Sequence, residues 1–202
     1  MNAMAPGKIR IISGIWRNSR LHVADLQGLR PTPERVRETL FNWLQPRLPG
    51  ARCLDLFAGT GALGFEAASR GAGHVTLVEH NPALVRCLHD TKTRLRADMV
   101  EVVQADALSW LLTSHSAFDI VFIDPPFAQN LWQQVLPALQ PILANEARVH
   151  IESPITTHYR VPAQWALLRE GHTRDMRHVL YAASAAGPVT LGLGKGEGGT
   201  DT

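Results

Sequence analysis

The sequence has little of what marks a secreted, disulfide-bonded or membrane-spanning protein. Its 202 residues include two cysteines, Cys53 and Cys87, too few for a disulfide framework or a cysteine-based zinc site, so a reducing cytoplasmic location is expected. Residues 1–7 lack the apolar stretch of a signal peptide, and no run approaches membrane-spanning length. The histidines lack convincing metal-ligand spacing, so we expect no metal and no membrane partner. The 45% hydrophobic content is ordinary for one globular domain, which we expect to be a monomer.

Positive charge is concentrated at the start of the chain. Residues 1–52 carry nine basic and three acidic side chains, a net charge of +6, which leaves −4 for the remainder of a chain whose total is +2. A basic segment on a mildly acidic body is typical of a local contact with a phosphate backbone. The same charges also fit a solvated basic face, so composition alone leaves both interpretations open.

Strands and helices are predicted to alternate from Arg52 onward. Predicted strands are Cys53–Phe57, His74–Val78, Val100–Gln104, Asp119–Ile123 and Arg148–Glu152, and predicted helices are Ala62–Ser69, Pro82–Leu95, Ala107–Leu112 and Leu131–Leu143, the last kinked or split by its prolines. Trp165–Glu170 and Arg177–Ala182 add a final antiparallel pair. This order predicts an α/β, Rossmann-like fold with a mostly parallel sheet and helices on both faces.

The two ends of the chain have a different character. The pattern over Ile9–Ile12 and Trp16–Val23 predicts extended structure of the kind that forms a hairpin. A helix capped by Thr32 is predicted to run to Pro46. We therefore expect a basic β extension over residues 1–29, a main domain over residues 30–184, and a glycine-rich, disordered tail over residues 185–202.

A glycine-rich turn follows the first strand of the main domain. Gly59 to Gly64 reads G-x-G-x-x-G, and Glu79 lies twenty residues beyond Gly59, as in a dinucleotide site. Asp55, just before the turn, argues against this interpretation, because a carboxylate repels a pyrophosphate but can bond a methionine ammonium. Glu79 suits either cofactor, since both present ribose hydroxyls. These residues favour S-adenosylmethionine, whose predicted site comprises Asp55, Phe57, Gly59, Gly61, Glu79, Asp106 and Ala107.

Asp106 has two possible roles. It follows the third strand of the main domain, where it could accept a hydrogen bond from the adenine amino group of a cofactor. It also precedes the helix predicted at Ala107, which it could simply cap.

The tetrapeptide Asp124-Pro125-Pro126-Phe127 follows the strand that ends at Ile123. Loops at the carboxyl ends of parallel strands share one crevice, so the tetrapeptide is expected beside the cofactor. An exocyclic base amine is a poor nucleophile that needs acceptors for both N–H groups, which the carboxylate of Asp124 and the carbonyl of Pro125 can supply. The two prolines stiffen the loop, and Phe127 offers a ring on which a flipped base can stack.

Together these residues resemble the bacterial small-subunit ribosomal RNA guanine-N2 methyltransferases of the RsmD type, over about residues 8–183. The matching stretches are Ile12–Gly14 with Arg17 and Leu21, Leu29–Thr32, Arg35–Leu44, Asp55–Gly64, Glu79 and Asp124–Phe127. The segment Arg17-Asn18-Ser19-Arg20 departs from the family's usual Arg-Gly-Arg turn.

The resemblance implies a class I methyltransferase fold with a small N-terminal β extension. It implies S-adenosylmethionine as cofactor and a guanine N2 of small-subunit ribosomal RNA as target, within an assembled or assembling subunit. Thr32 would lie near the cofactor, and Arg17, Arg20, Arg30, Arg35 and Arg37 would contact RNA. The alternative is an adenine-N6 methyltransferase acting on DNA or RNA, because the same acceptors suit that amine.

Overall fold

The computed structural model describes residues 9–21 and 32–183. Its helices, in chain order, are α1 (Glu34–Leu44), η1 (Gln45–Arg47), α2 (Ala62–Ser69), α3 (Pro82–Leu95), α4 (Ala107–Thr113), η2 (Phe127–Gln129), α5 (Trp132–Ala138) and η3 (Gln140–Ile142). Its strands are β1 (Ile9–Arg10), β2 (Arg20–Leu21), β3 (Arg52–Asp55), β4 (His74–Glu79), β5 (Val100–Gln104), β6 (Phe118–Ile123), β7 (Leu143–Pro154), β8 (Ala166–His172) and β9 (Met176–Ala183).

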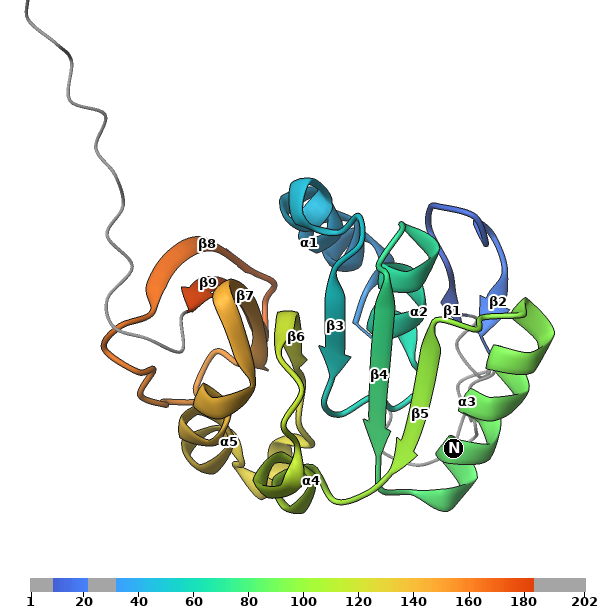
Figure 1. Cartoon of the computed structure of the whole chain (residues 1–202). Coiled ribbons are helices and arrows are strands. Elements are labelled where there is room, and N and C mark those ends of the chain that lie inside the picture. The colour runs from blue at the N-terminus through green and yellow to red at the C-terminus, as the bar shows by residue number, and fades with distance from the viewer. Residues whose placement is uncertain (1–8, 22–31, 184–202) are drawn as a thin grey trace, which may run out of the picture.

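Seven strands form one sheet in the order β5-β4-β3-β6-β7-β9-β8 (Figure 1). The first five of these are parallel to one another, and β9 runs antiparallel to both β7 and β8. This confirms the predicted mostly parallel, Rossmann-like sheet with an antiparallel final pair. The predicted helix Leu131–Leu143 is split into α5 and η3, as its prolines indicated.

Two hydrophobic cores lie on opposite faces of the sheet. One combines α1, α2 and α3 with side chains such as Phe41, Phe65 and Phe122. The other combines α4 and α5 with side chains such as Leu111, Trp132 and Val149. Among the described residues, no helix is long and apolar enough to cross a bilayer.

The N-terminal hairpin is shorter than predicted. β1 and β2 pair antiparallel, but residues 15–18 form turns where the sequence suggested strand. Asn18 has φ 66°, a left-handed conformation that asparagine tolerates better than most residues, which explains how it fits a turn where the family has Arg-Gly-Arg. Ile9, Ile11 and Leu21 belong to the same core as α1 and α2. The predicted tail, residues 185–202, lies outside the described residues.

The start of α1 differs from the prediction. The helix begins at Glu34 with Pro33 as its N-cap and no side-chain cap, so the prediction that Thr32 caps it is wrong. The Thr32 hydroxyl instead donates a hydrogen bond to Glu152 Oε2 at 2.8 Å. As an N-cap the Thr32 oxygen would accept a helix N–H, whereas here the hydroxyl donates to a buried carboxylate, a charge-assisted hydrogen bond.

Candidate active site

The glycine turn between β3 and α2 depends on close backbone packing. Gly61, the N-cap of α2, has φ 75°, a backbone conformation that residues other than glycine rarely adopt. Gly64 lies inside α2, where an added Cβ would sit 2.1 Å from Leu77 Cδ2 on β4. The third glycine of the motif therefore lets the helix approach the sheet closely, as in nucleotide-binding turns.

Asp55 ends β3 beneath this turn. Its carboxylate is buried, and its Oδ2 accepts the Gly64 backbone N–H at 3.0 Å. Burial raises the pKa of Asp55 to about 7, against the opposing effect of the Gly64 hydrogen bond, with a further rise from the charge of Glu79. Asp55 thus fixes the first turn of α2, and its expected contact with a methionine ammonium stays a prediction.

Glu79 joins the end of β4 to the glycine turn. One carboxylate oxygen accepts the Gly59 N–H at 2.9 Å, and the other accepts the Asn81 N–H at 2.8 Å. The exposed ring of His80 places its Nδ1 3.2 Å from the same carboxylate. Two of the predicted cofactor residues, twenty positions apart in sequence, are therefore in direct contact.

A pocket opens beside Glu79 at the carboxyl ends of β3, β4, β5 and β6. Its lining residues are Leu56, Phe57, Val78, Glu79, His80, Ala105, Asp106, Ala107, Pro126, Gln129 and Leu131. The structure thus brings the predicted Phe57, Glu79, Asp106 and Ala107 together, whereas Thr32 is not among these residues. Sequence reasoning missed His80, Gln129 and Leu131, although His80 directly follows Glu79 and the other two lie within four residues of Phe127.

Asp106 is the N-cap of α4, where its side chain accepts the Ser109 N–H at 2.9 Å. This hydrogen bond is the main reason that the pKa of Asp106 is lowered. The helix-cap interpretation is confirmed. Its proposed bond to the cofactor adenine stays a prediction, consistent with its place in the pocket lining.

The tetrapeptide directly follows the last residue of β6, and its two prolines stiffen the loop. Asp124 is half-buried, Pro125 is buried, and Phe127 begins η2 with 39% of its surface exposed. Burial raises the pKa of Asp124 well above its usual value, and the nearby charges of Glu152 and Asp55 raise it further. A carboxylate with a raised pKa is suited to accepting a proton.

Phe127 is the outer ring of a stack of three aromatic rings. Its ring lies 6.3 Å from that of Trp132 at an interplanar angle of 23°, and Trp132 lies 6.2 Å from Tyr159 at 14°. Trp132 is buried and donates its Nε1–H to the Glu152 carbonyl at 3.1 Å. The stack leaves Phe127 partly open to solvent as a platform for a planar ring.

The arginines predicted to contact RNA differ in their exposure to solvent. Arg17, Arg20 and Arg35 are exposed, and Arg30 lies outside the described residues. Arg37 is buried, donates to the Arg10 carbonyl at 3.0 Å and lies 3.9 Å from Glu66. The prediction that Arg37 contacts RNA is therefore wrong, because its guanidinium holds the hairpin against α1 and α2.

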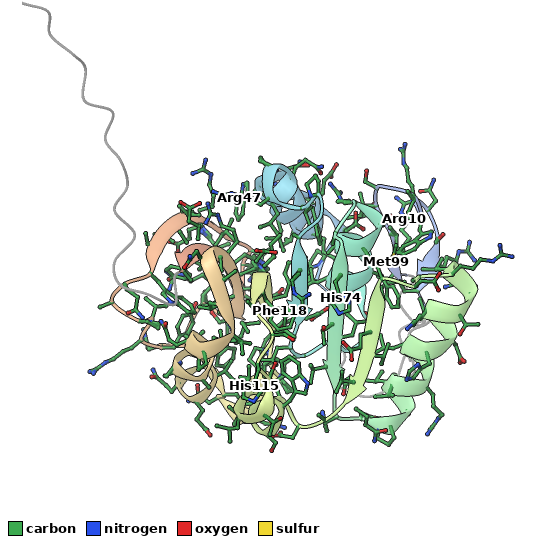
Figure 2. All side chains as sticks on the ribbon, viewed as in Figure 1. Arg10, Arg47, His74, Met99, His115 and Phe118 are labelled. Carbon is green, nitrogen blue, oxygen red and sulfur yellow. The ribbon has the colours of Figure 1, made fainter. Side chains whose placement is uncertain are left out.

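The hairpin tip lies at the far end of the sheet from the tetrapeptide. The Ile15 N–H bonds the carbonyl of Ser69, the last residue of α2, a helix that starts at the glycine turn and is about 12 Å long. In Figure 1 the arrowheads of β3 and β4 point down and the β1–β2 connection lies at the top, and Figure 2 shows Arg10 at the same upper edge. Arg17 therefore lies away from the pocket.

This sheet order, with the pocket and tetrapeptide at its carboxyl edge, defines a class I methyltransferase. Residues 9–182 match the model of the family described as "Conserved hypothetical protein 95". The chain belongs to this family, the RsmD family.

Named relatives cover nearly the whole chain. It is 43% identical over 189 residues to "Ribosomal RNA small subunit methyltransferase D" of Escherichia coli (strain K12), an alignment that covers 92% of this chain and 96% of the relative. It is 39% identical to the protein of that name from Haemophilus influenzae, covering 88% of this chain and 95% of the relative.

Solved structures agree with the fold. "Putative methyltransferase yhhF from Escherichia coli" superposes with a TM-score of 0.83 at 42% identity, covering 89% of this chain and all of that one. An RNA methyltransferase from Salinibacter ruber, determined in complex with S-adenosyl-L-homocysteine, gives a TM-score of 0.61 at 20% identity, covering 81% of this chain and 99% of that one. At that identity the second likeness concerns the fold alone.

Proposed function

We propose that this protein transfers a methyl group from S-adenosylmethionine to the exocyclic N2 of a guanine in small-subunit ribosomal RNA. The observation that carries the proposal is the shared wall of the pocket. Glu79 and Asp106 line it from the cofactor side, while Pro126 and Gln129 line it from the tetrapeptide segment. A methyl donor in this pocket and a base at Asp124 are thereby neighbours.

The pocket residues fit the cofactor. Leu56, Phe57 and Val78 offer apolar walls for an adenine ring, and Glu79 offers carboxylate oxygens for two ribose hydroxyls. When bound, the cofactor supplies an electrophilic methyl group. The protein contributes the positioning of the two reactants, which is the main source of acceleration for a displacement of this kind.

The tetrapeptide holds the acceptor base. Phe127, supported by Trp132, stacks on a base that has left its helix, and the Asp124 carboxylate accepts one N–H of the exocyclic amine. The Pro125 carbonyl accepts the other. As the amine nitrogen gains the methyl group it becomes more acidic, and Asp124 takes the proton that leaves.

Exposed arginines complete the substrate contact. Arg17, Arg20 and Arg35 are solvent-accessible and can pair with phosphates. We propose the same contact for Arg30. Because the hairpin lies far from the tetrapeptide, one substrate must span both, which favours a folded RNA within an assembled or assembling subunit. We propose that the protein acts as a monomer.

The test supplies methyl-labelled cofactor and small ribosomal subunits that lack the modification, and then identifies the labelled nucleoside. N2-methylguanosine is the expected product; N6-methyladenosine would replace the proposal by adenine methylation. Asp124→Ala should abolish transfer while S-adenosylhomocysteine binding persists, and Asp98→Asn, at an exposed site after α3, should change neither. Full turnover by Asp124→Ala would overturn the catalytic role.

A further inference from the structure

Residues 155–177 form a second basic segment, far from the N-terminus in sequence. They carry four arginines and two acidic side chains, a net charge of +2, within a part of the chain, residues 53–202, whose total is −4. One of the acidic side chains, Glu170, is paired with Arg177 at 2.7 Å. The segment contains the connection from β7 to β8 and the turn from β8 to β9, so its charge is carried largely on exposed loops.

The turn between β8 and β9 lies at the carboxyl end of β7. Pro154, the last residue of β7, pairs with Met176, the first residue of β9. The Ile155 N–H continues this ladder by donating to the Asp175 carbonyl at 3.1 Å. Arg174, the residue before Asp175, therefore lies beside the carboxyl end of β7.

This turn is close to the active-site tetrapeptide. β6 and β7 pair in parallel with Ile123 opposite Ile151, so Asp124 lies at the level of residue 152. From Asp124, the position of Asp175 is two strand spacings of about 4.8 Å to the side and three residues of about 3.3 Å further out, a separation of about 14 Å. A nucleic-acid strand that advances about 3.4 Å per nucleotide covers this distance in about four nucleotides.

Arg160 lies on the connection from β7 to β8, which packs behind the base platform. Its neighbour in sequence, Tyr159, is the third ring of the stack, in contact with Trp132, which in turn contacts Phe127. These ring contacts fix the position of the connection relative to Phe127. Arg160 is therefore held near the platform on which the target base is proposed to stack.

Both arginines are available to an external anion. Arg160 and Arg174 are exposed, and neither forms an ion pair within the part of the chain that the structure describes. An arginine presents five N–H donors in a planar fork whose geometry matches a phosphate. Single surface arginines are common, but these two belong to separate connections that both adjoin the tetrapeptide.

We propose that Arg160 and Arg174 bind backbone phosphates of the RNA strand that flanks the flipped base. The proposal rests on the proposed function and adds to it a second RNA-contact surface, next to the active site and separate from the N-terminal hairpin. Phosphate contacts fix the register and orientation of a strand without reading its sequence. The two arginines hold the strand while the tetrapeptide binds the base.

Binding of a short RNA tests the proposal. The probe is a stem-loop that carries the nucleotide methylated in the natural substrate and its immediate neighbours, and its Kd is measured by fluorescence anisotropy across a salt series. Arg160→Ala and Arg174→Ala should each raise the Kd by about 2- to 5-fold, as for an exposed ion pair. Each should also make the slope of log affinity against log salt shallower by about one unit.

Charge-preserving variants and a distant arginine serve as controls. Arg160→Lys and Arg174→Lys should retain most of the affinity, because a lysine ammonium still pairs with a phosphate. Arg86→Ala, which removes an exposed arginine on α3, should leave the Kd of the stem-loop unchanged.

Methylation of small ribosomal subunits provides a second readout. The Arg160→Ala/Arg174→Ala double variant should show a raised KM with kcat unchanged, because the lost contacts bind the substrate and its transition state equally. S-adenosylhomocysteine should bind this variant as it binds the wild type.

The outcomes distinguish this proposal from the proposed function. An unchanged Kd, salt slope and KM in the double variant would overturn the phosphate contacts, and so would an equal loss in the lysine and alanine variants. A product other than N2-methylguanosine would overturn the proposed function, whereas the phosphate contacts would still be measured on the same RNA.

Discussion

The Glu66 carboxylate accepts the backbone N–H of Ile12 at 2.7 Å across 54 residues of sequence. The same side chain accepts the Ser13 N–H at 3.1 Å and the Arg70 Nε–H at 2.6 Å, and it lies 3.9 Å from Arg37. Glu66 is fully buried, so the N-terminal hairpin is attached to α1 and α2 through one desolvated charge network.

Replacing Glu66 by glutamine should therefore destabilise the protein. Removing one partner of a buried ion network leaves the others uncompensated, at a cost of about 3 kcal/mol. Denaturant unfolding measures the change. Glu34→Gln, which breaks an exposed pair with Arg10, is the control and should cause little change. Equal losses in both variants would show that burial of the network contributes nothing.

Glu79→Gln should weaken cofactor binding by about 10- to 100-fold. The change removes a charge from a group that bonds the Gly59 N–H and faces the pocket, and hydrogen bonds to charged groups contribute about 1.5–3 kcal/mol. Calorimetric titration with S-adenosylhomocysteine gives the affinity, with Glu101→Gln as a matched control. Unchanged affinity would move the ribose contact to another residue.

Activity should fall on the acid side at a higher pH than an ordinary aspartate would give. Asp124 acts in its ionised form, and its pKa is raised by burial and by the charges of Glu152 and Asp55. The kcat/KM should therefore rise with pH, and the midpoint of this acid limb should lie above the usual aspartate pKa of about 3.9. Glu152→Gln removes one of these negative charges and should move the limb to lower pH; a limb that stays in place would exclude this coupling.

RNA binding should weaken, whatever the RNA sequence, in each of the variants Arg17→Ala, Arg20→Ala and Arg35→Ala. Each change removes an exposed cation, so the slope of log affinity against log salt should become shallower by about one unit. Binding of the substrate RNA across a salt series provides the measurement, with Arg86→Ala on α3 as the control. A slope that changes only in the control would place the RNA surface on α3.

The stacked rings of His150 and His178 should make stability depend on pH. Their centroids lie 6.2 Å apart at an interplanar angle of 5°. Burial, and for His150 also its neighbour His178, lowers the pKa values of His150 and His178 to about 3 and 4. The unfolded chain takes up protons near pH 6.5, whereas the folded chain does not, so this stability is present above that pH and lost below it.

His150→Phe tests this dependence because it keeps a ring at the same place. As pH falls from 7 to 5, the wild type should lose unfolding free energy that the variant keeps. The difference between the two should change in favour of the variant by up to about 1.4 kcal/mol per pH unit. Denaturant titrations at each pH give the difference. A constant difference across the range would show that His150 does not titrate on unfolding.

The sequence determined the local features of this protein. The alternation of apolar runs, the glycines at 59, 61 and 64 and the prolines at 125 and 126 specify strands, a tight turn and a stiff loop through short-range sterics. Because parallel strands end at one edge, the motifs at Glu79 and Asp124 could also be placed together in advance. The family resemblance rests on these motifs and on the matching stretches before them, Leu29–Thr32 and Arg35–Leu44 above all.

Tertiary structure decided which polar side chains are buried and what they contact. Arg35 and Arg37 are two residues apart, yet one is exposed and the other joins Glu66, because only one face of α1 packs on the core. Thr32 could have capped a helix, but the packing of the segment before α1 against β7 placed Glu152 within its reach, 120 residues away. Burial and long-range pairing depend on packing between elements, which no local pattern in a single sequence records.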